Sequence, residues 1–315
     1  MKISIVFSYP PVPKSIIEKL ESFGEVNTVY ADKLSEEDII EKIPETEILI
    51  CGNGWVSKIG KRVFAWLKKL KFIAIYGVGY DWVDIEEANK SGIIISNTVG
   101  GNAESVAEHT WWMILNLSKR ISELERKTRT TWANNVKDYQ GMEVFRKTIG
   151  IIGLGEIGKR VARIAKWFDM RIIGTNRTGK EVDDIEIVDL SYLLRNSDII
   201  TLCIPLNSST ENIIGEQELE LMKHNVILIN SSREKFVNKN AVLETIAKKR
   251  LFGYGVETEL LAPIPPTDDY FKHPNILVTP HNAWNTKESE ENNFTIIMKN
   301  VEAFLDGDPI NVVKI

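Results

Sequence analysis

The sequence predicts an α/β protein made of two doubly wound parallel-sheet domains. Short apolar segments with the character of buried strands alternate with amphipathic helical segments along the chain, which is typical of parallel sheets. The length of 315 residues suits about two domains of ordinary size. A glycine-rich turn at residues 153–158 opens a second series of strands and helices near the middle of the chain.

The first series lies before this turn. Its expected strands are near residues 3–7, 48–51, 72–76 and 93–96, and its expected helices cover 15–23, 35–43 and 62–70. Ser35 with Asp38 three residues later is typical of a helix start. The helical pattern from Ala103 to Arg129 is too long for a simple crossover, so we expect it to link two domains.

The second series continues from the glycine turn towards the C-terminus. Its expected strands are near residues 171–175, 199–204, 226–231, 253–258 and 276–279. A final helix over 286–306 follows this complete sheet, so we expect the helix to return to the first domain. One domain is therefore expected to comprise residues 1–98 and 285–315, and the other residues 99–284.

The glycine turn follows an apolar strand and leads directly into an amphipathic helix. In such a turn Gly153 permits the tight bend, Gly155 lets the backbone approach a pyrophosphate, and Gly158 lets helix and strand pack closely. Glu156 and Ile157 then offer backbone N–H groups near the phosphates. This pattern predicts a Rossmann dinucleotide-binding domain; the alternative is a glycine-rich turn in another kind of α/β protein.

Composition and charge argue against several other classes of protein. The net charge is −5 and no block of basic residues stands out, so nucleic acid is not an expected partner. No apolar run approaches about 18 residues, so no membrane span is expected. Cys51 and Cys203 lie far apart and give neither a disulfide framework nor a metal-ligand spacing. We therefore expect a cytoplasmic protein without a metal site.

Ordered blocks along nearly the whole chain resemble the D-isomer specific 2-hydroxyacid dehydrogenase family, in particular glyoxylate and hydroxypyruvate reductases. The matching blocks are residues 76–84, 92–98, 104–109, 153–158, 205–210, 221–223, 229–233 and 279–281. This resemblance implies a flavodoxin-like substrate domain first and a Rossmann domain second, with the active site between them. It also implies hydride transfer between NAD(P)H and a small 2-keto or 2-hydroxy acid, and a homodimer formed through the linking helix.

Reduction of a 2-keto acid needs a cation for the carboxylate, donors that polarise the carbonyl, and an acid for the new alkoxide. Arg233 follows a strand, where parallel sheets place their ligands, and the resemblance makes it the group that grips carboxylate and carbonyl. His281 follows another strand, and the resemblance makes it the acid/base. The resemblance assigns substrate contacts in the first domain to Val78, Gly79, Asn53 and Gly54.

The cofactor preference depends on the end of the second strand of the dinucleotide-binding domain. A carboxylate there usually binds the ribose hydroxyls of NAD. Here the chain has Asn176, Arg177 and Thr178, with Lys180 close by, which favours the 2′-phosphate of NADP; NAD bound through Asn176 is the alternative. By position, the remaining cofactor contacts are Ile204, Pro205 and Thr210 on the adenosine side and Ser231 and Glu257 near the nicotinamide.

The chain departs from the family pattern at one catalytic position. The family places a glutamate 29 residues after the arginine, where it bonds the catalytic histidine; here this position is Ala262. Without that carboxylate the pKa of His281 is expected nearer its ordinary value of about 6.5. Glu257 or Glu259 could compensate. If neither does, the alternative function is a catalytically weak or inactive dinucleotide-binding regulatory protein.

Overall fold

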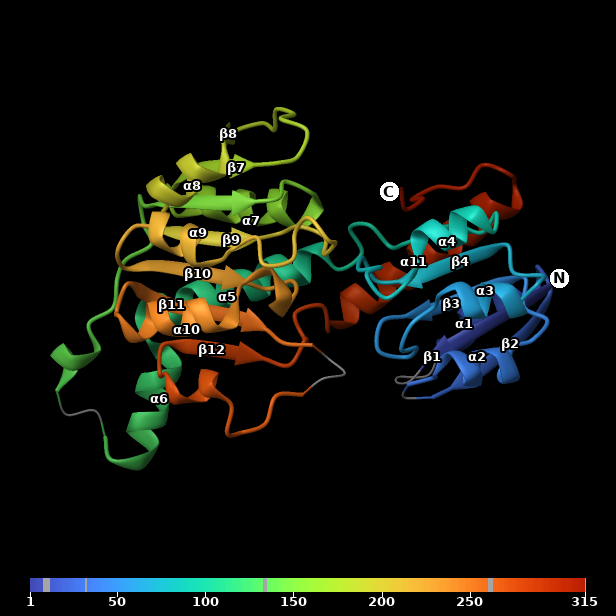
Figure 1. The fold of residues 1–315 in the computed structure, drawn as a ribbon, viewed down its shortest axis with the longest axis horizontal. Helices are drawn as coiled ribbons and strands as arrows, with labels where there is room; N and C mark the ends of the chain where they lie inside the picture. Colours follow the sequence, from blue (N-terminus) through green and yellow to red (C-terminus); the bar gives the residue numbers. More distant parts are fainter. Residues whose placement is uncertain (8–11, 32, 133–134, 260–262, 315) are drawn as a thin grey trace. The chain divides into compact units, whose positions relative to one another are not determined.

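A computed structural model describes residues 1–7, 12–31, 33–132, 135–259 and 263–314 (Figure 1). The chain divides into two compact units, Met1–Asn102 with Thr286–Ile315, and Ala103–Asn285. The sequence-based boundaries stand at residues 98/99 and 284/285. The predicted α/β architecture with parallel sheets is confirmed in both units.

The first unit is built on a parallel sheet with the strand order β2-β1-β3-β4-β5 (Figure 1). Its strands are β1 (Lys2–Phe7), β2 (Glu25–Tyr30), β3 (Ile48–Gly52), β4 (Phe72–Tyr76) and β5 (Ile94–Ser96). The residues of β3 and β4 are buried throughout, as expected for central strands covered on both faces. The order 2-1-3-4-5 is that of flavodoxin-like sheets.

Helices cover the sheet of the first unit in two groups. They are α1 (Lys14–Glu21), α2 (Glu36–Lys42), α3 (Lys61–Trp66), α4 (Ile85–Lys90) and α11 (Lys287–Leu305). The C-terminal α11 packs against β4 and α1, while α2, α3 and α4 pack in series. Phe294 on α11 lies 5.4 Å from Phe7 and 5.1 Å from Tyr76 between ring centroids, so α11 is part of this core.

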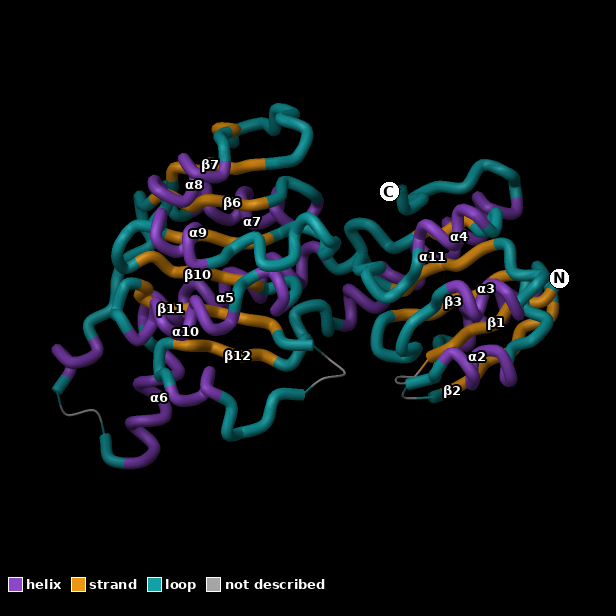
Figure 2. Tube along the Cα trace, in the orientation of Figure 1, coloured by secondary structure: helices purple, strands orange, loops and turns teal. Residues whose placement is uncertain are grey.

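The second unit is built on a parallel sheet with the order β12-β11-β10-β9-β6-β7-β8 (Figure 2). Its strands are β6 (Thr148–Ile152), β7 (Arg171–Thr175), β8 (Glu186–Ile187), β9 (Ile199–Leu202), β10 (Val226–Asn230), β11 (Leu251–Glu257) and β12 (Ile276–Thr279). From β8 to β11 this is the Rossmann order 3-2-1-4-5-6, which β12 extends. The order reverses between β6 and β9, and such a switch point is where open α/β sheets bind ligands.

Two hydrophobic cores flank this sheet. The helices are α5 (Ala103–Lys119), α6 (Ile121–Thr130), α7 (Glu156–Trp167), α8 (Leu190–Asn196), α9 (Glu216–Leu221) and α10 (Lys239–Ala247), with short 3-10 helices η1 (Val136–Tyr139), η2 (Glu234–Phe236) and η3 (Asp269–Lys272). One core packs α5 and α7 against the sheet, where the Trp111 indole donates to the carbonyl of Val161 at 3.1 Å. The other core packs α8, α9 and α10.

Helix lengths and edge strands differ from the sequence-based expectation. The long helix expected from Ala103 is broken at Arg120, which has a φ of +54°. The Arg120 guanidinium holds this break by donating to Glu123 and to the carbonyl of Asp138. The helix expected over 62–70 ends earlier, with α3. Strands β2 and β8 are additional, because their partly polar, partly exposed sequences give no continuous apolar run.

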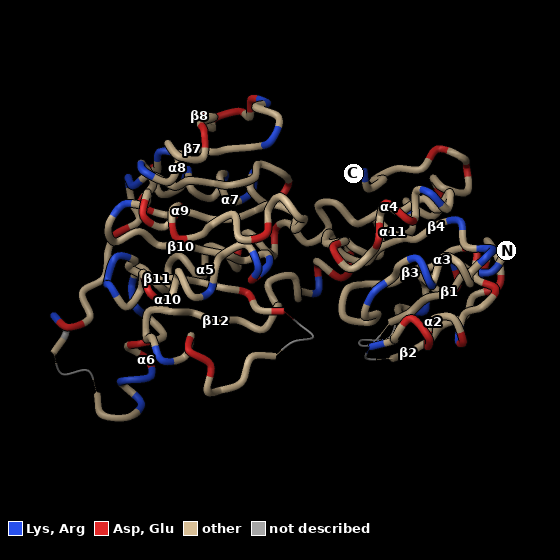
Figure 3. Tube along the Cα trace, in the orientation of Figure 1, with Lys and Arg blue, Asp and Glu red and all other residues tan. Residues whose placement is uncertain are grey.

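Charges of both signs are interspersed over both units (Figure 3). In the part of the chain that the structure describes, no helix has the length and apolar character needed to cross a membrane. Within the same residues, no group of three or more His, Cys, Asp and Glu side chains could hold a metal ion.

The start of α2 provides a test of the local folding signals. Ser35 accepts a hydrogen bond from the Asp38 backbone N–H at 3.2 Å, and its own N–H donates to the Asp38 carboxylate at 2.9 Å. Ser35→Ala is expected to lower the free energy of unfolding by about 1 kcal/mol in urea titrations followed by circular dichroism. The matched control is Ser57→Ala at an exposed site. An equal loss in both variants would contradict this role of Ser35.

Candidate active site

The glycine turn between β6 and α7 has the shape that a dinucleotide requires. Gly153 has a φ of +97°, and a Cβ there would lie 2.4 Å from the Cys203 carbonyl oxygen. A Cβ at Gly158 would lie 2.1 Å from the Gly153 carbonyl oxygen. At Gly155, by contrast, a Cβ would meet nothing within 4 Å. The backbone is thus tightly packed on the protein side and open at Gly155, which fits the close approach of a pyrophosphate.

The first turn of α7 is tied to α5. The Arg160 guanidinium donates to the Glu156 carboxylate at 2.7 Å and to Glu104 of α5 at 2.7 Å. The hydrogen bond from Arg160 lowers the pKa of the Glu156 carboxyl below its ordinary value. Ile157, next along α7, is partly buried and packs against the core beneath α5 and α7. The backbone N–H groups at the start of α7 are therefore held in place by the packing of two helices.

The loop after β7 is organised by Asn176. Its side-chain oxygen accepts hydrogen bonds from the backbone N–H of Thr178 at 3.1 Å and of Lys180 at 3.2 Å, and from the Thr178 hydroxyl. Its amide nitrogen donates to the Lys180 carbonyl at 2.9 Å. Asn176 therefore folds the loop, while Arg177 and Lys180 are exposed on it. In Figure 3 this segment between β7 and β8 carries basic residues as well as acidic ones.

The segment after β9 is closed by Thr210. The Thr210 hydroxyl donates to the Pro205 carbonyl at 2.9 Å and accepts from the backbone N–H of Asn207 at 2.9 Å. Ile204, at the start of this segment, is partly buried and packs against the core beneath α8, α9 and α10. Thr210 thus fixes the conformation of the loop after β9, beside the switch point, through hydrogen bonds within that loop.

Arg233 leaves the sheet at the end of β10 through a turn fixed by Asn230. The buried Asn230 amide donates to the Arg233 carbonyl at 2.7 Å. Ser231 is buried as well, and its hydroxyl lies 2.7 Å from that of Thr110 on α5, whose own hydrogen goes to the Val106 carbonyl. The Ser231 hydroxyl is therefore the donor to α5. These contacts fix the backbone from which the Arg233 side chain extends.

His281 is positioned by the pairing of β11 with β12. Glu257 lies opposite Thr279 in this parallel register, and the Thr258 backbone N–H donates to the Thr279 carbonyl at 3.0 Å. The chain then turns at His281, which has a φ of +57°. The turn brings the ring nitrogen Nδ1 of His281 to 3.1 Å from the Thr258 carbonyl oxygen. Because a carbonyl only accepts, Nδ1 carries the hydrogen in this contact.

Glu257 is almost completely buried, with 2 % of its surface exposed. Its Oε1 atom accepts a hydrogen bond from the Thr279 hydroxyl at 2.5 Å and lies 2.9 Å from Nε2 of His109 on α5. His109 Nε2 also lies 3.3 Å from the Thr279 hydroxyl. The Glu257 carboxylate is thus held by Thr279 and lies against His109.

Arg233 and His281 lie close enough for their charges to interact. Burial lowers the pKa of His281 below the ordinary value of 6.5, and the positive charge of Arg233 lowers it further. The negative charges of Glu257 and Glu259 oppose this shift with smaller effects. The pKa of His281 therefore lies below its ordinary value, because the ring is buried beside a guanidinium.

The expected substrate contacts of the first unit lie in the loops after β3 and β4. The Val78 carbonyl accepts from the Asn97 amide at 2.8 Å, and the Gly79 carbonyl accepts from the Trp82 indole at 3.1 Å. For the backbone N–H groups of Val78 and Gly79, the structure records no acceptor within its described residues. Asn53 pairs with Val56 in an isolated bridge, and Gly54 between them has a φ of +99°.

Comparison with known proteins decides the family. Residues 111–283, more than half of the chain, match the family model described as D-isomer specific 2-hydroxyacid dehydrogenase, NAD binding domain. The glyoxylate reductase of Thermococcus litoralis is 35 % identical over 321 aligned positions that cover 98 % of this chain and 96 % of that protein. The chain belongs to this family. It is an NAD(P)-dependent 2-hydroxyacid dehydrogenase.

Solved structures of similar proteins contain either nicotinamide cofactor. An acyclic imino acid reductase in complex with NADPH and D-Arg is 30 % identical to this dehydrogenase, with a TM-score of 0.93 and complete coverage of both chains. The NAD-dependent formate dehydrogenase from Staphylococcus aureus, in complex with NAD, is 25 % identical with a TM-score of 0.84, covering 100 % of this chain and 99 % of that one. The fold of this dehydrogenase is thus shared by a protein that binds NADPH and by one that binds NAD.

Two contacts in the site of this dehydrogenase escape sequence reasoning. No motif indicates that His109 on α5 lies against Glu257. The contact of His281 with the Thr258 carbonyl cannot be found by a sequence motif, because every residue has a backbone carbonyl. Neither Glu257 nor Glu259 hydrogen-bonds to His281 within the described residues. Ala262 lies outside them.

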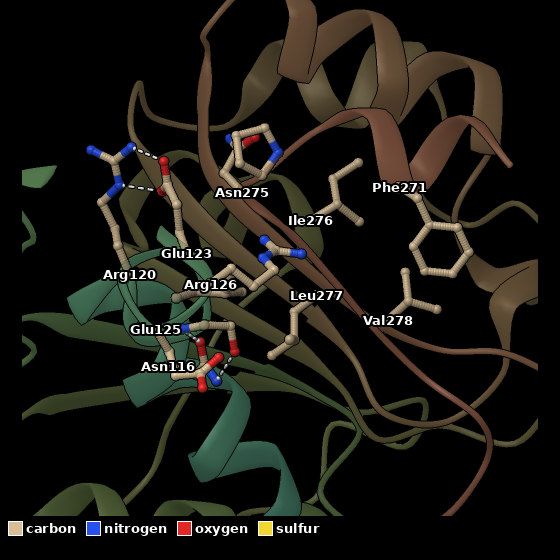
Figure 4. A pocket seen from close by; sticks show the side chains of 13 residues that line it. Asn116, Arg120, Glu123, Glu125, Arg126, Phe271, Asn275, Ile276, Leu277 and Val278 are labelled. Atoms are coloured by element: carbon tan, nitrogen blue, oxygen red, sulfur yellow. Dashed lines mark hydrogen bonds and ion pairs between the residues drawn. The ribbon is translucent and has the colours of Figure 1, made fainter. Parts of the chain in front are cut away.

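A cavity of about 290 Å³ lies elsewhere in the second unit (Figure 4). It is bordered by the α5–α6 junction and by the segment that leads into β12, and Arg126 points into it. The paired Arg120 and Glu123 lie at its side. None of the residues expected to bind substrate or cofactor lines it.

The open space at Gly155 leads to a test of cofactor binding. Gly155→Ser places a side chain where the pyrophosphate is expected, and serine is well suited to the N-cap position of α7. We expect thermal stability to be retained and the dissociation constant for the dinucleotide to rise about tenfold or more, measured by calorimetry. Gly215→Ser, at the N-cap of α9, is the matched control and should leave binding unchanged. Unchanged binding in Gly155→Ser would show that the pyrophosphate lies elsewhere.

Proposed function

We propose that this dehydrogenase reduces small 2-keto acids with NADPH, as glyoxylate and hydroxypyruvate reductases do. The observation that carries the proposal is the proximity of Arg233 and His281, whose charges interact in the unit that contains the glycine turn. A guanidinium for the substrate carboxylate and an imidazole for the carbonyl oxygen are the groups this reaction needs. The similarity to the glyoxylate reductase of Thermococcus litoralis supports the same reaction.

Each proposed residue has a chemical role. Arg233 binds the carboxylate and polarises the carbonyl, and protonated His281 donates a proton to the carbonyl oxygen as the alkoxide forms. The Val78 and Gly79 N–H groups are proposed carboxylate donors, with Asn53 and Gly54 nearby. The bound nicotinamide supplies the hydride. Glu257 and the backbone at Ser231 are proposed to lie near the nicotinamide.

We propose NADP as the preferred cofactor. Position 176 is an asparagine, so it offers no carboxylate to bind ribose hydroxyls or to repel a phosphate. The Asn176 side chain instead hydrogen-bonds within its own loop. Arg177 and Lys180 are exposed on that loop, and the Thr178 hydroxyl lies between them. Two cations and a hydroxyl suit a 2′-phosphate.

This preference is tested by comparing dissociation constants. NADPH is expected to bind more tightly than NADH, and Arg177→Ala should weaken NADPH binding about tenfold because a hydrogen bond to a charged group is lost. Binding of NADH should change little in the same variant. Lys68→Ala, which removes an exposed cation in the first unit, is the control. Tighter binding of NADH to the unaltered protein would refute the preference.

The second candidate function is a regulatory protein that binds the dinucleotide with little or no catalysis. The observation that favours it is the alanine at position 262, since no carboxylate there can hold His281 in its charged form. The position of His281 beside Arg233 favours catalysis instead. Measurement of NADPH oxidation with a panel of keto acids separates the two functions.

The pH dependence of keto-acid reduction tests His281 as the acid. The charged ring is the proton donor, and the pKa of His281 is lowered from its ordinary value of 6.5 by burial and by the positive charge of Arg233, so the charged fraction grows as pH falls. The rate should therefore rise as pH falls from about 8 to about 5, in proportion to the charged fraction. A flat profile across this range would rule out His281 as the acid.

We also propose a homodimer formed through α5, in a cytoplasmic protein. Trp112 on α5 is 44 % exposed, an unusual position for a large aromatic side chain. Both Cys51 and Cys203 are free thiols, which agrees with a reducing compartment.

A further inference from the structure

We propose that this site also reduces 2-imino acids, in which a C=N bond replaces the C=O bond of the keto acid. The reason is that the neutral ring of His281 presents a hydrogen-bond acceptor where an iminium group presents a donor. The inference rests on the proposed function, because it concerns the same reacting centre.

The first step of the argument is the tautomer of His281. Nδ1 lies 3.1 Å from the Thr258 carbonyl oxygen, which accepts and never donates. A carbonyl also does not titrate, so this contact keeps the hydrogen on Nδ1 whether the ring is charged or neutral. In the neutral ring the other nitrogen, Nε2, is therefore an unprotonated acceptor.

The second step is the match between this acceptor and the substrate. Within the described residues, Nε2 of His281 has no hydrogen-bond partner. A keto oxygen is also an acceptor, so no hydrogen bond forms between it and Nε2 of the neutral ring, and their lone pairs repel each other. An iminium nitrogen carries N–H groups and donates to Nε2. The neutral ring thus suits C=N, and only the charged ring suits C=O.

The third step concerns which form of the ring prevails. Arg233 faces it from the turn after β10, Glu257 and Glu259 from β11 and the segment after it, and His109 adjoins Glu257 from α5. Burial and Arg233 lower the pKa of His281 more than the two carboxylates raise it. Glu257 already accepts from Thr279. The prevailing form at neutral pH is the neutral ring.

The reaction balances without a proton from the protein. The bound cofactor supplies a hydride to the imine carbon, and the C=N electron pair moves to nitrogen. R–C(=NH₂⁺)–COO⁻ becomes R–CH(NH₂)–COO⁻, and the cofactor is left oxidised. The amine later takes a proton from water. Keto-acid reduction, by contrast, needs a proton on the new alkoxide, which the neutral ring cannot give.

The first experiment uses pyruvate with NADPH at pH 8, in ammonium chloride or in potassium chloride of equal ionic strength. We expect ammonium to raise NADPH oxidation about tenfold or more, with one alanine formed per NADPH. Lactate formation at the same rate in both salts, without alanine, overturns this inference and leaves the proposed function standing. No NADPH oxidation with any keto acid, with or without ammonium, overturns both.

The second experiment uses His281→Asn, because asparagine tolerates the positive φ of this position. An amide oxygen still accepts from an iminium N–H, but an amide is no acid. Keto-acid reduction should fall about 100-fold and imino-acid reduction less than about tenfold. Equal losses would contradict the acceptor role. Circular dichroism checks that the variant folds.

The third experiment reads binding rather than turnover. D-alanine and D-lactate are titrated calorimetrically into the protein with NADP⁺, at pH 5.5 and at pH 8. The neutral ring accepts from an amine, so the affinity for D-alanine relative to D-lactate should rise about tenfold between these pH values and stay constant in His281→Asn. A ratio that does not change with pH in the unaltered protein would refute the proposal.

Discussion

The hydrogen bond between His281 and the Thr258 carbonyl is the constraint on which the chemistry of this site depends. It exists because β11 and β12 pair in a parallel register that sets Glu257 opposite Thr279, so that the next residues of both strands leave the sheet side by side. The left-handed backbone at His281 then turns the ring back towards Thr258. A main-chain oxygen thus orients the ring, a role that the resemblance to the family assigns to a carboxylate.

The kind of group that hydrogen-bonds to His281 affects the charge of the ring. A carboxylate would add a negative charge and favour the imidazolium, whereas the Thr258 carbonyl adds no full charge and raises the pKa of His281 less than burial and Arg233 lower it. Glu257 does not take over, because it is fixed by Thr279 and lies against His109. Burial of the ring and, after it, the positive charge of Arg233 therefore outweigh the groups that favour the charged form of His281. The lowered pKa favours the neutral ring of His281, whose Nε2 atom is then a hydrogen-bond acceptor.

The fold could be predicted from the sequence because its signals are local. Apolar strand runs, the glycine turn and the Ser35 cap each follow from neighbouring residues, and the structure contains them. The edge strands β2 and β8 could not be predicted, since partly exposed strands lack an apolar run. The break at Arg120 depends on contacts with Glu123 and with the distant carbonyl of Asp138.

The site was predictable only as a set of residue types. Strand ends and motifs indicate Arg233, His281 and the glycines, because chemistry of this kind recurs in fixed patterns. The sequence does not show that His109 lies against Glu257, which depends on how α5 crosses the sheet. Nor does it show the Thr258 contact, which depends on strand register and on one backbone angle.

The tautomer and charge of His281 are measured most directly by ¹⁵N nuclear magnetic resonance of the histidine-labelled protein, with the His281 signals assigned through His281→Asn. The account predicts that the neutral ring carries its hydrogen on Nδ1 and that the ring titrates below pH 6.5. A neutral ring protonated on Nε2, or a titration midpoint above 6.5, would contradict it.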